Sequence, residues 1–252
     1  DAYLGLNDYA KALNEYAKAV AIDPLIFKKD LNLYARLGDA AFKIGDMEKA
    51  RAYLLLSINL GDPRTKTIQM LRLGDCLYKL GQMRQAVEVY SQVGNVPVQG
   101  ENMVIAKLRK ATILIDNDLK DDGRLANKTF YEVLGIYDSI EIAPNSPESA
   151  LAPIVKIRRA QAYARHGDWD QAFEAFDQSW RETKPEDPLH KYAYSEAITS
   201  LAARLRILST QGDSKAMLDI YGRYRPSFLA DIRDPEVMLI LAQAFVKEGQ
   251  PA

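Results

Sequence analysis

The feature that most constrains the fold of this chain is an internal repeat. Residues 37–50, LGDAAFKIGDMEKA, align with residues 73–86, LGDCLYKLGQMRQA, at an offset of 36 residues. A third copy occupies residues 160–176, and a shorter fourth copy occupies residues 241–249. Because a single unit of this size cannot bury its own apolar face, consecutive units are expected to stack on one another in chain order.

Each copy has the pattern of two amphipathic helices joined by a tight corner. Apolar residues recur at three- and four-residue spacing, and periodic strand alternation is absent. Small residues such as Gly38 and Ala50 indicate close helix crossings, and Asp46 and Asp168 are placed to cap the second helix of their units. A glycine able to adopt the left-handed conformation closes the first helix of each copy, at positions 45, 81, 167 and 249.

The periodicity predicts an all-α chain. Paired helices are expected over 28–44 with 46–60, 65–80 with 83–93, 101–116 with 124–142, 148–166 with 169–183, and 189–211 with 214–224. Single helices are expected over 8–22 and 235–248. Prolines lie at the boundaries between these units, where a helix can begin but cannot continue.

These residues make the chain resemble the tetratricopeptide repeat family. Its units place a Leu-Gly pair and a Tyr on one helix, and an Ala, an aromatic residue, a second Ala and a closing Pro on the next. The resemblance implies a right-handed superhelical solenoid of antiparallel helix pairs with a concave groove, forming one domain over residues 1–252. It is weaker in 100–150 and 188–230, where the repeat count stays open. Because the pattern starts and stops within units, we expect a fragment of a longer array.

Composition excludes several other classes of protein. The chain has 252 residues and a net charge of −1, and neither half is strongly basic: residues 1–126 carry a net +2 and residues 127–252 a net −3. A nucleic-acid partner is therefore not expected. No apolar run reaches the ~18 residues of a membrane span, and no targeting or lipidation motif is visible. The short segment 144–152 resembles unit openings of bacterial envelope repeat proteins, which favours a periplasmic setting.

Residues suited to catalysis or metal binding are sparse. Nucleotide-binding and hydrolase motifs are absent, and one cysteine cannot build a Cys-rich metal site. We interpret His166 as a cation in the last turn of a helix and His190 as a surface residue. The acidic run 116–123 fails as an EF-hand loop, because Lys120 and Thr129 occupy ligand positions. We therefore predict no enzymatic activity, no cofactor and no metal.

A basic residue recurs two positions before the closing glycine of each copy. In the resembled family the corresponding positions face the concave groove. The candidate partner-binding residues are Asp39, Phe42, Lys43, Asp75, Tyr78, Lys79, Gln161, Arg165 and Lys247. A second interpretation stays open: these cations could simply stabilise helix C-termini and pair with Asp39 and Asp75 one turn earlier.

The pattern indicates a non-catalytic scaffold that holds a peptide or helix of another protein in its groove. Binding of a chaperone carboxylate tail, known for one subtype of the family, is not expected, because Ala35 and Leu71 replace its polar residues and Asp39 and Asp75 would repel a carboxylate. The alternative is a self-assembling scaffold of a bacterial envelope or export complex, whose ends stack on other copies. An enzyme would need a converging titratable cluster, which the sequence does not indicate.

Overall fold

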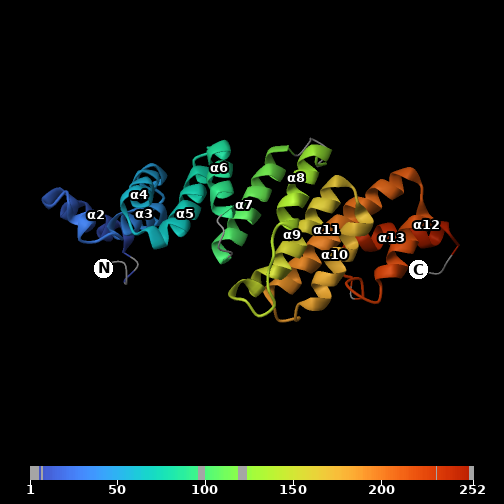
Figure 1. Ribbon diagram of the computed structural model, residues 1–252. Helices are drawn as coiled ribbons and strands as arrows, with labels where there is room; N and C mark the ends of the chain where they lie inside the picture. The colour runs from blue at the N-terminus through green and yellow to red at the C-terminus, as the bar shows by residue number, and fades with distance from the viewer. Residues whose placement is uncertain (1–5, 7, 96–99, 119–123, 231, 250–252) are drawn as a thin grey trace. The chain divides into compact units, whose positions relative to one another are not determined.

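The computed structural model describes residues 6, 8–95, 100–118, 124–230 and 232–249. All regular elements within these residues are helical, which confirms the predicted all-α class. The chain divides into two compact units, residues 1–113 and 114–252. Figure 1 shows the helices in chain order, from α2 near the N-terminus to α12 and α13 near the C-terminus.

Unit 1 is a stack of helices in which the helices from α2 to α6 each contact the next along the chain. Its helices are α2 (Tyr9–Ile22), α3 (Leu33–Lys43), α4 (Met47–Leu60), α5 (Lys66–Lys79), α6 (Met83–Gly94) and α7 (Glu101–Asp118), the last up to residue 113. Short 3₁₀ turns, η1 (Ile26–Lys28) and η2 (Pro63–Thr65), precede α3 and α5. The predicted pairs are therefore α3 with α4 and α5 with α6.

Unit 2 is built around the pair α9 and α10 and the long helix α11. Its helices are α8 (Asn127–Asp138), α9 (Ala152–His166), α10 (Trp169–Glu182), α11 (Pro188–Gln211), α12 (Ser214–Tyr224) and α13 (Pro235–Lys247), with the 3₁₀ turn η3 (Pro147–Leu151) before α9. Helix α11 contacts α9, α10, α12 and α13. The core contains the fully buried Phe173, Phe176, Leu205 and Phe228.

Glycines close the first helix of the recurring units, as predicted. Gly45, Gly81, Gly167 and Gly249 have φ of +86°, +74°, +103° and +66°. Asp46 caps α4 by accepting a hydrogen bond from the backbone N–H of Lys49 at 3.2 Å. The prediction that Asp168 caps α10 in the same way is wrong, because its side chain makes no cap bond and lies instead 2.8 Å from His166 Nδ1.

The small residues mark close helix crossings, as the sequence predicted. A Cβ atom added at Gly38 would lie 2.9 Å from the Leu54 side chain, and one added at Gly74 would lie 2.4 Å from Cε1 of Tyr90. Ala50 and Ala86, the small residues of the second helices, are fully buried. Any larger side chain at these glycines would force α3 away from α4, or α5 away from α6.

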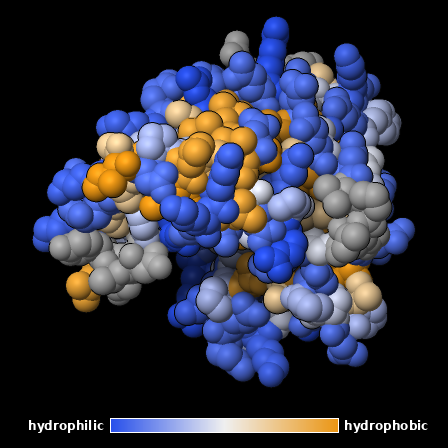
Figure 2. All heavy atoms as spheres, turned by 60° about the vertical axis from the view of Figure 1, so that its left-hand side comes forward, coloured by the Kyte–Doolittle hydropathy of each residue, from blue (hydrophilic) through white to orange (hydrophobic). Residues whose placement is uncertain are grey.

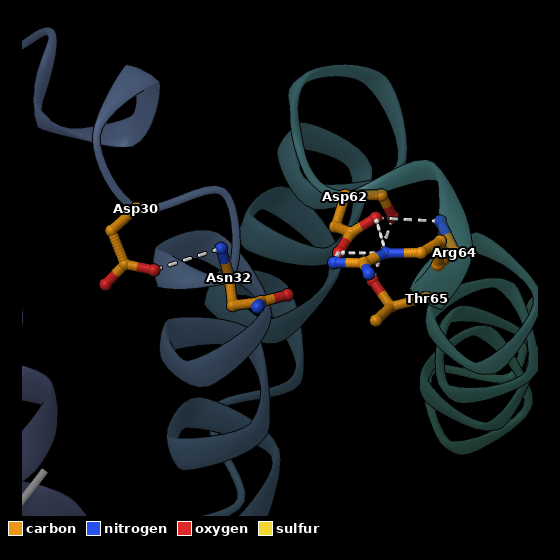
Figure 3. Close-up of polar contacts among 5 residues, drawn as sticks. All are labelled: Asp30, Asn32, Asp62, Arg64 and Thr65. Carbon is orange, nitrogen blue, oxygen red and sulfur yellow. Dashed lines mark hydrogen bonds and ion pairs between the residues drawn. The ribbon is translucent and has the colours of Figure 1, made fainter.

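The turns that open α3 and α5 are held by aspartates, as Figure 3 shows. Asp30 Oδ1 accepts from the backbone N–H of Asn32 at 3.1 Å. Asp62 accepts from the backbone N–H of Arg64 at 2.9 Å and from its guanidinium at 2.7 Å, and its carbonyl accepts from Thr65 Oγ1 at 3.0 Å. The Asp30 turn and η1 delay the helix predicted over 28–44, so that it begins at residue 33.

Two other predicted helices also begin later than expected. The helix predicted over 124–142 begins at Asn127 and ends at Asp138. The helix predicted over 148–166 begins at Ala152, because residues 147–151 form a 3₁₀ turn instead. The remaining boundaries agree with the sequence prediction to within two residues.

Candidate partner-binding groove

Ion pairs connect successive first helices of unit 1. Arg72 of α5 pairs with Asp39 of α3, and Arg109 of α7 pairs with Asp75 of α5. Asp39 and Asp75 occupy the same place in their repeats, six residues before the closing glycine. Each acidic residue therefore binds a guanidinium of the following first helix, and within the described residues no ion pair joins it to the lysine one turn away on its own helix.

The Asp75 carboxylate has a second donor within its own unit. Tyr90 of α6 is almost fully buried, and its hydroxyl donates to Asp75 Oδ1 at 2.6 Å. Burial raises the pKa of Tyr90, and the hydrogen bond to the carboxylate raises it further, so that the phenol stays protonated. Burial also raises the pKa of Asp39, although the guanidinium of Arg72 opposes that shift. These acidic groups hold neighbouring helices together.

Two hollows lie beside these ion pairs. The α5–α7 hollow has a volume of about 390 Å³ and is lined by Phe42, Asp75, Tyr78, Lys79, Tyr90, Arg109, Thr112 and Ile113. The α3–α5 hollow has a volume of about 400 Å³ and is lined by Tyr9, Asp39, Phe42, Lys43, Leu54, Arg72 and Asp75. Because Phe42 and Asp75 line both, the two hollows form one continuous surface, which we call the unit 1 groove.

The cationic and aromatic side chains of the unit 1 groove are close together. Lys79 Nζ lies 4.4 Å from the centroid of the Phe42 ring, which is a cation–π arrangement. Tyr78 is 40% exposed at the rim. Lys43 is also exposed, and among the described residues neither Lys43 nor Lys79 forms an ion pair. The groove thus offers two available ammonium groups beside an apolar wall.

The structure places the nine candidate residues in three locations. Asp39, Phe42, Lys43, Asp75, Tyr78 and Lys79 lie together in the unit 1 groove. Gln161 and Arg165 line a separate hollow of about 290 Å³ in unit 2, the α9–α11 hollow. Lys247 lies at a helix end, where its ammonium donates to the carbonyl oxygen of Gly212 at 2.8 Å.

Sequence reasoning missed Arg72, Arg109 and Tyr90, which complete the lining of the unit 1 groove. A signal for Arg72 was present in the sequence. Arg36, Arg72 and Arg158 each lie nine residues before the closing glycine of their copy. The recurrence marks a position on the same face as the acidic residue three positions later, but it does not reveal which helix supplies the partner.

The two histidines take part in helix packing. His166 stacks on Phe130 of α8 with ring centroids 3.8 Å apart, and its Nε2 lies 3.0 Å from Asn127 Oδ1. His190, which was expected at the surface, is half-buried: its ring lies 5.1 Å from the Trp180 ring, and its Nδ1 lies 3.1 Å from the Thr183 carbonyl oxygen.

Metal-ligating residues do not cluster in the part of the chain that the structure describes, where no group of three or more His, Cys, Asp or Glu could hold an ion. Most of the acidic run proposed and rejected as a calcium loop, residues 119–123, lies outside the described residues. A search of the described helices likewise finds none with the length and apolar character needed to span a membrane.

Comparison with known proteins identifies the repeat. Two family models, both described as tetratricopeptide repeat, match residues 1–62 and 70–96. Residues 1–62 and 70–96 carry tetratricopeptide repeats. No curated protein matches it. The matched segments contain all six candidate groove residues of unit 1.

Solved structures of other proteins share the fold at low sequence identity. YrrB, described as having an unusual peptide-binding site, is 16% identical with a TM-score of 0.53, over 77% of this chain and 87% of its own. BtubC from P. vanneervenii is 17% identical with a TM-score of 0.54, and the match covers 91% of this chain and 92% of BtubC. MamA from Desulfovibrio magneticus RS-1 is 16% identical with a TM-score of 0.51, and the match covers 88% of this chain and 97% of the MamA chain.

Proposed function

We propose that this tetratricopeptide repeat protein is a non-catalytic interaction module whose unit 1 groove binds a segment of a partner protein. The observation that carries the proposal is the continuous lining of the two hollows by residues at equivalent positions of successive repeats. A row of equivalent positions suits an extended or helical peptide, whose own side chains recur at regular intervals. The peptide-binding site described for YrrB supports the same use of the fold.

The charges of unit 1 favour an acidic partner segment. Residues 1–113 contain 16 basic and 12 acidic residues, a net charge of +4, whereas residues 114–252 contain 17 and 22, a net charge of −5. Within the groove, Asp39 and Asp75 are neutralised by arginines, so Lys43 and Lys79 are the groups left to pair with a partner. Charge-assisted hydrogen bonds to carboxylates and contacts with Phe42 and Tyr78 would hold such a segment.

The proposal is tested by reversing the two groove lysines. Peptides are selected from a random display library against the full chain, and the best is measured by fluorescence anisotropy. We expect acid-rich peptides, and we expect Lys43→Glu combined with Lys79→Glu to weaken binding at least about tenfold, since each lost charged contact contributes about 1.5–3 kcal/mol. The control is Lys66→Glu with Arg84→Glu, which changes the charge equally at exposed positions outside both hollows.

The two interpretations of the lysines give opposite results in this experiment. If they serve the groove, the double variant keeps nearly its full melting temperature and loses the peptide. If they serve the helix termini, the melting temperature falls markedly while the folded fraction binds the peptide as tightly as the control variant does. The second result would refute the groove function.

Self-assembly is the second candidate, favoured by exposed apolar side chains on α4. Leu55, Leu56 and Leu60 are 44%, 38% and 40% exposed. Figure 2 shows an apolar patch among hydrophilic side chains, in a view that brings the N-terminal side forward. If copies associate through this helix, light scattering after size exclusion gives a mass that rises with concentration, and Leu55→Glu with Leu56→Glu restores a single monomeric mass. A monomer at all concentrations would exclude this candidate.

A further inference from the structure

Helix α13 is apolar on two faces. On one face Val237 and Leu241 are buried in the core of unit 2, where α13 contacts α11 and α12. The other face carries Met238, Leu239 and Val246, which are 51%, 60% and 73% exposed. A helix that is apolar on all sides is normally covered on all sides. We therefore expect a partner to cover this exposed face of α13.

The exposed face of α13 is one that the complete repeats bury. Residues of the first helices can be aligned by their distance from the closing glycine, which is Gly249 in α13. Ten residues before it, Leu239 is mostly exposed, whereas the same position is almost fully buried in the other first helices. The equivalent residues are Ala35, Leu71 and Ile157. What covers this position in a complete repeat is therefore missing at α13.

The crossing position of α13 is also incompletely covered. Ala242 lies seven residues before the closing glycine, where α3 has Gly38 and α5 has Gly74. In those repeats the side chain that crosses the glycine comes from the second helix, Leu54 in α4 and Tyr90 in α6. Ala242 has the small side chain that such a crossing needs, yet it is only half-buried. The face of α13 thus has the form of a first helix that awaits a second helix.

Helix α2 has the features of such a second helix. Its N-cap Asp8 accepts a hydrogen bond from the backbone N–H three residues later, as Asp46 does at the start of α4. Eight residues after the cap, Tyr16 takes the place of Leu54 in α4 and of Tyr90 in α6. Leu54 and Tyr90 are almost fully buried, whereas Tyr16 is half-buried.

A second position of α2 shows the same difference in burial. Ala19, eleven residues after the cap, is half-buried, whereas its equivalents in the second helices of complete repeats are almost fully buried. These equivalents are Ser57, Val93 and Ser179. Among the described residues no helix precedes α2. This side of α2 is therefore available for a first helix supplied by another molecule.

The charges of the two units favour a contact between unlike ends of two copies. Unit 1, which contains α2, carries a net charge of +4, and unit 2, which contains α13, carries −5. Opposite net charges favour the encounter of α2 of one copy with α13 of another. Contacts between two copies of α2, or between two copies of α13, would instead bring like charges together.

We propose that a second copy of this chain covers the exposed face of α13, with its α2 as the second helix of the repeat that α13 begins. Tyr16 of the second copy then crosses α13 at Ala242, as Tyr90 crosses α5 at Gly74. Because each copy uses one face of each kind, the contact is heterologous and can be repeated from copy to copy. The proposal rests on the self-assembly considered above, but it uses neither the leucines of α4 nor the lysines of the groove.

The test is a complementation experiment with two variants, measured by light scattering after size exclusion from about 10 μM to about 1 mM. The mass of the parent should rise with concentration. Leu239→Glu with Val246→Glu removes the α13 face, and Ala19→Glu removes the α2 face, so each variant alone should be monomeric. Mixed in equal amounts, they should form a dimer and nothing larger, because together they supply one intact face of each kind.

The α4 variant, Leu55→Glu with Leu56→Glu, is the matched control, because it places the same charges on exposed leucines of another helix. It should associate as the parent does, which separates this interface from association through α4. The peptide binding proposed for the groove should be unchanged in the α13 variant, so failure of that function would be recognised separately.

Circular dichroism checks the fold of each variant. Should Ala19→Glu unfold, cross-linking decides the question: Ala242→Cys mixed with Tyr16→Cys should give a disulfide-linked dimer on oxidation, and Leu56→Cys mixed with Tyr16→Cys should not. The parent, whose one cysteine, Cys76, is buried, is the blank. A parent that is monomeric at every concentration, an α13 variant that associates like the parent, or a mixture without dimer or cross-link would each overturn the proposal.

Discussion

The close crossing at Gly74 makes a quantitative test of the repeat packing. In Gly74→Ala the new Cβ would lie 2.4 Å from Cε1 of Tyr90 and 2.8 Å from its Cδ1 and Cζ. The ring cannot turn aside freely, because it is 2% exposed and its hydroxyl is bound to Asp75 at 2.6 Å. Relief therefore requires that α5 and α6 separate, or that the Tyr90–Asp75 hydrogen bond break.

The expected loss follows from these contacts. Overpacking of a core costs about 1–3 kcal/mol. Partial loss of the hydrogen bond between Tyr90 and the charged Asp75 adds to it, since such bonds contribute about 1.5–3 kcal/mol. Replacing glycine by alanine inside a helix stabilises the helix by about 1 kcal/mol, which offsets part of this loss. We therefore expect Gly74→Ala to lower the free energy of unfolding by about 2–3 kcal/mol, even though a single methyl group is added.

Urea denaturation followed by far-UV circular dichroism measures this loss. Gly135→Ala in α8 is the matched control, because nothing lies within 4 Å of the added Cβ, and it should be neutral or stabilising by up to about 1 kcal/mol. Tyr90→Leu should recover part of the loss when it is combined with Gly74→Ala, as expected of residues in contact. The reasoning is refuted if Gly74→Ala is as stable as Gly135→Ala.

Two further predictions concern single side chains. Burial raises the pKa of Tyr137 to about 12, from about 10 in the unfolded chain, so its stabilising contribution is complete below pH ~10 and is lost as the pH rises towards 12. Over this range the free energy of unfolding of the parent protein should fall by about 2–3 kcal/mol more than that of Tyr137→Phe. Urea titrations at a series of alkaline pH values measure both, and an identical pH dependence in the two proteins would contradict the prediction. Asp46→Ala should lower the melting temperature through the loss of about 1 kcal/mol of capping, and Asp46→Asn should largely retain it; equal losses in the two variants would show that the cap contributes nothing.

Local signals in the sequence predicted most of the fold correctly. Glycines at fixed places in the repeat closed helices because only they adopt positive φ without strain, and small residues marked the crossings at Gly38 and Gly74. The predicted helix starts and caps were wrong where a side chain at a turn forms a different hydrogen bond from the one expected. Asp30 and η1 delay the start of α3, and Asp168 bonds His166 instead of capping α10.

The candidate groove was predicted in part. Recurrence in register predicted a row of basic and aromatic residues on successive first helices, because the repeat spacing carries one unit onto the next; that Lys79 lies over the Phe42 ring of the preceding unit was not predicted. Recurrence could not predict that Lys247 bonds the carbonyl of Gly212, since that contact depends on how the end of α11 meets α13.

The sequence alone determined the class of this protein, because the period of its apolar and small residues permits only stacked helix pairs in the recurring units. Tertiary structure decided how its charges are used. Asp75 could have paired with Lys79 one turn along its own helix, yet packing of α7 against the groove brings Arg109 closer. Local spacing offered only Lys79 as a partner, whereas the approach of a second helix, which no local pattern encodes, supplied Arg109.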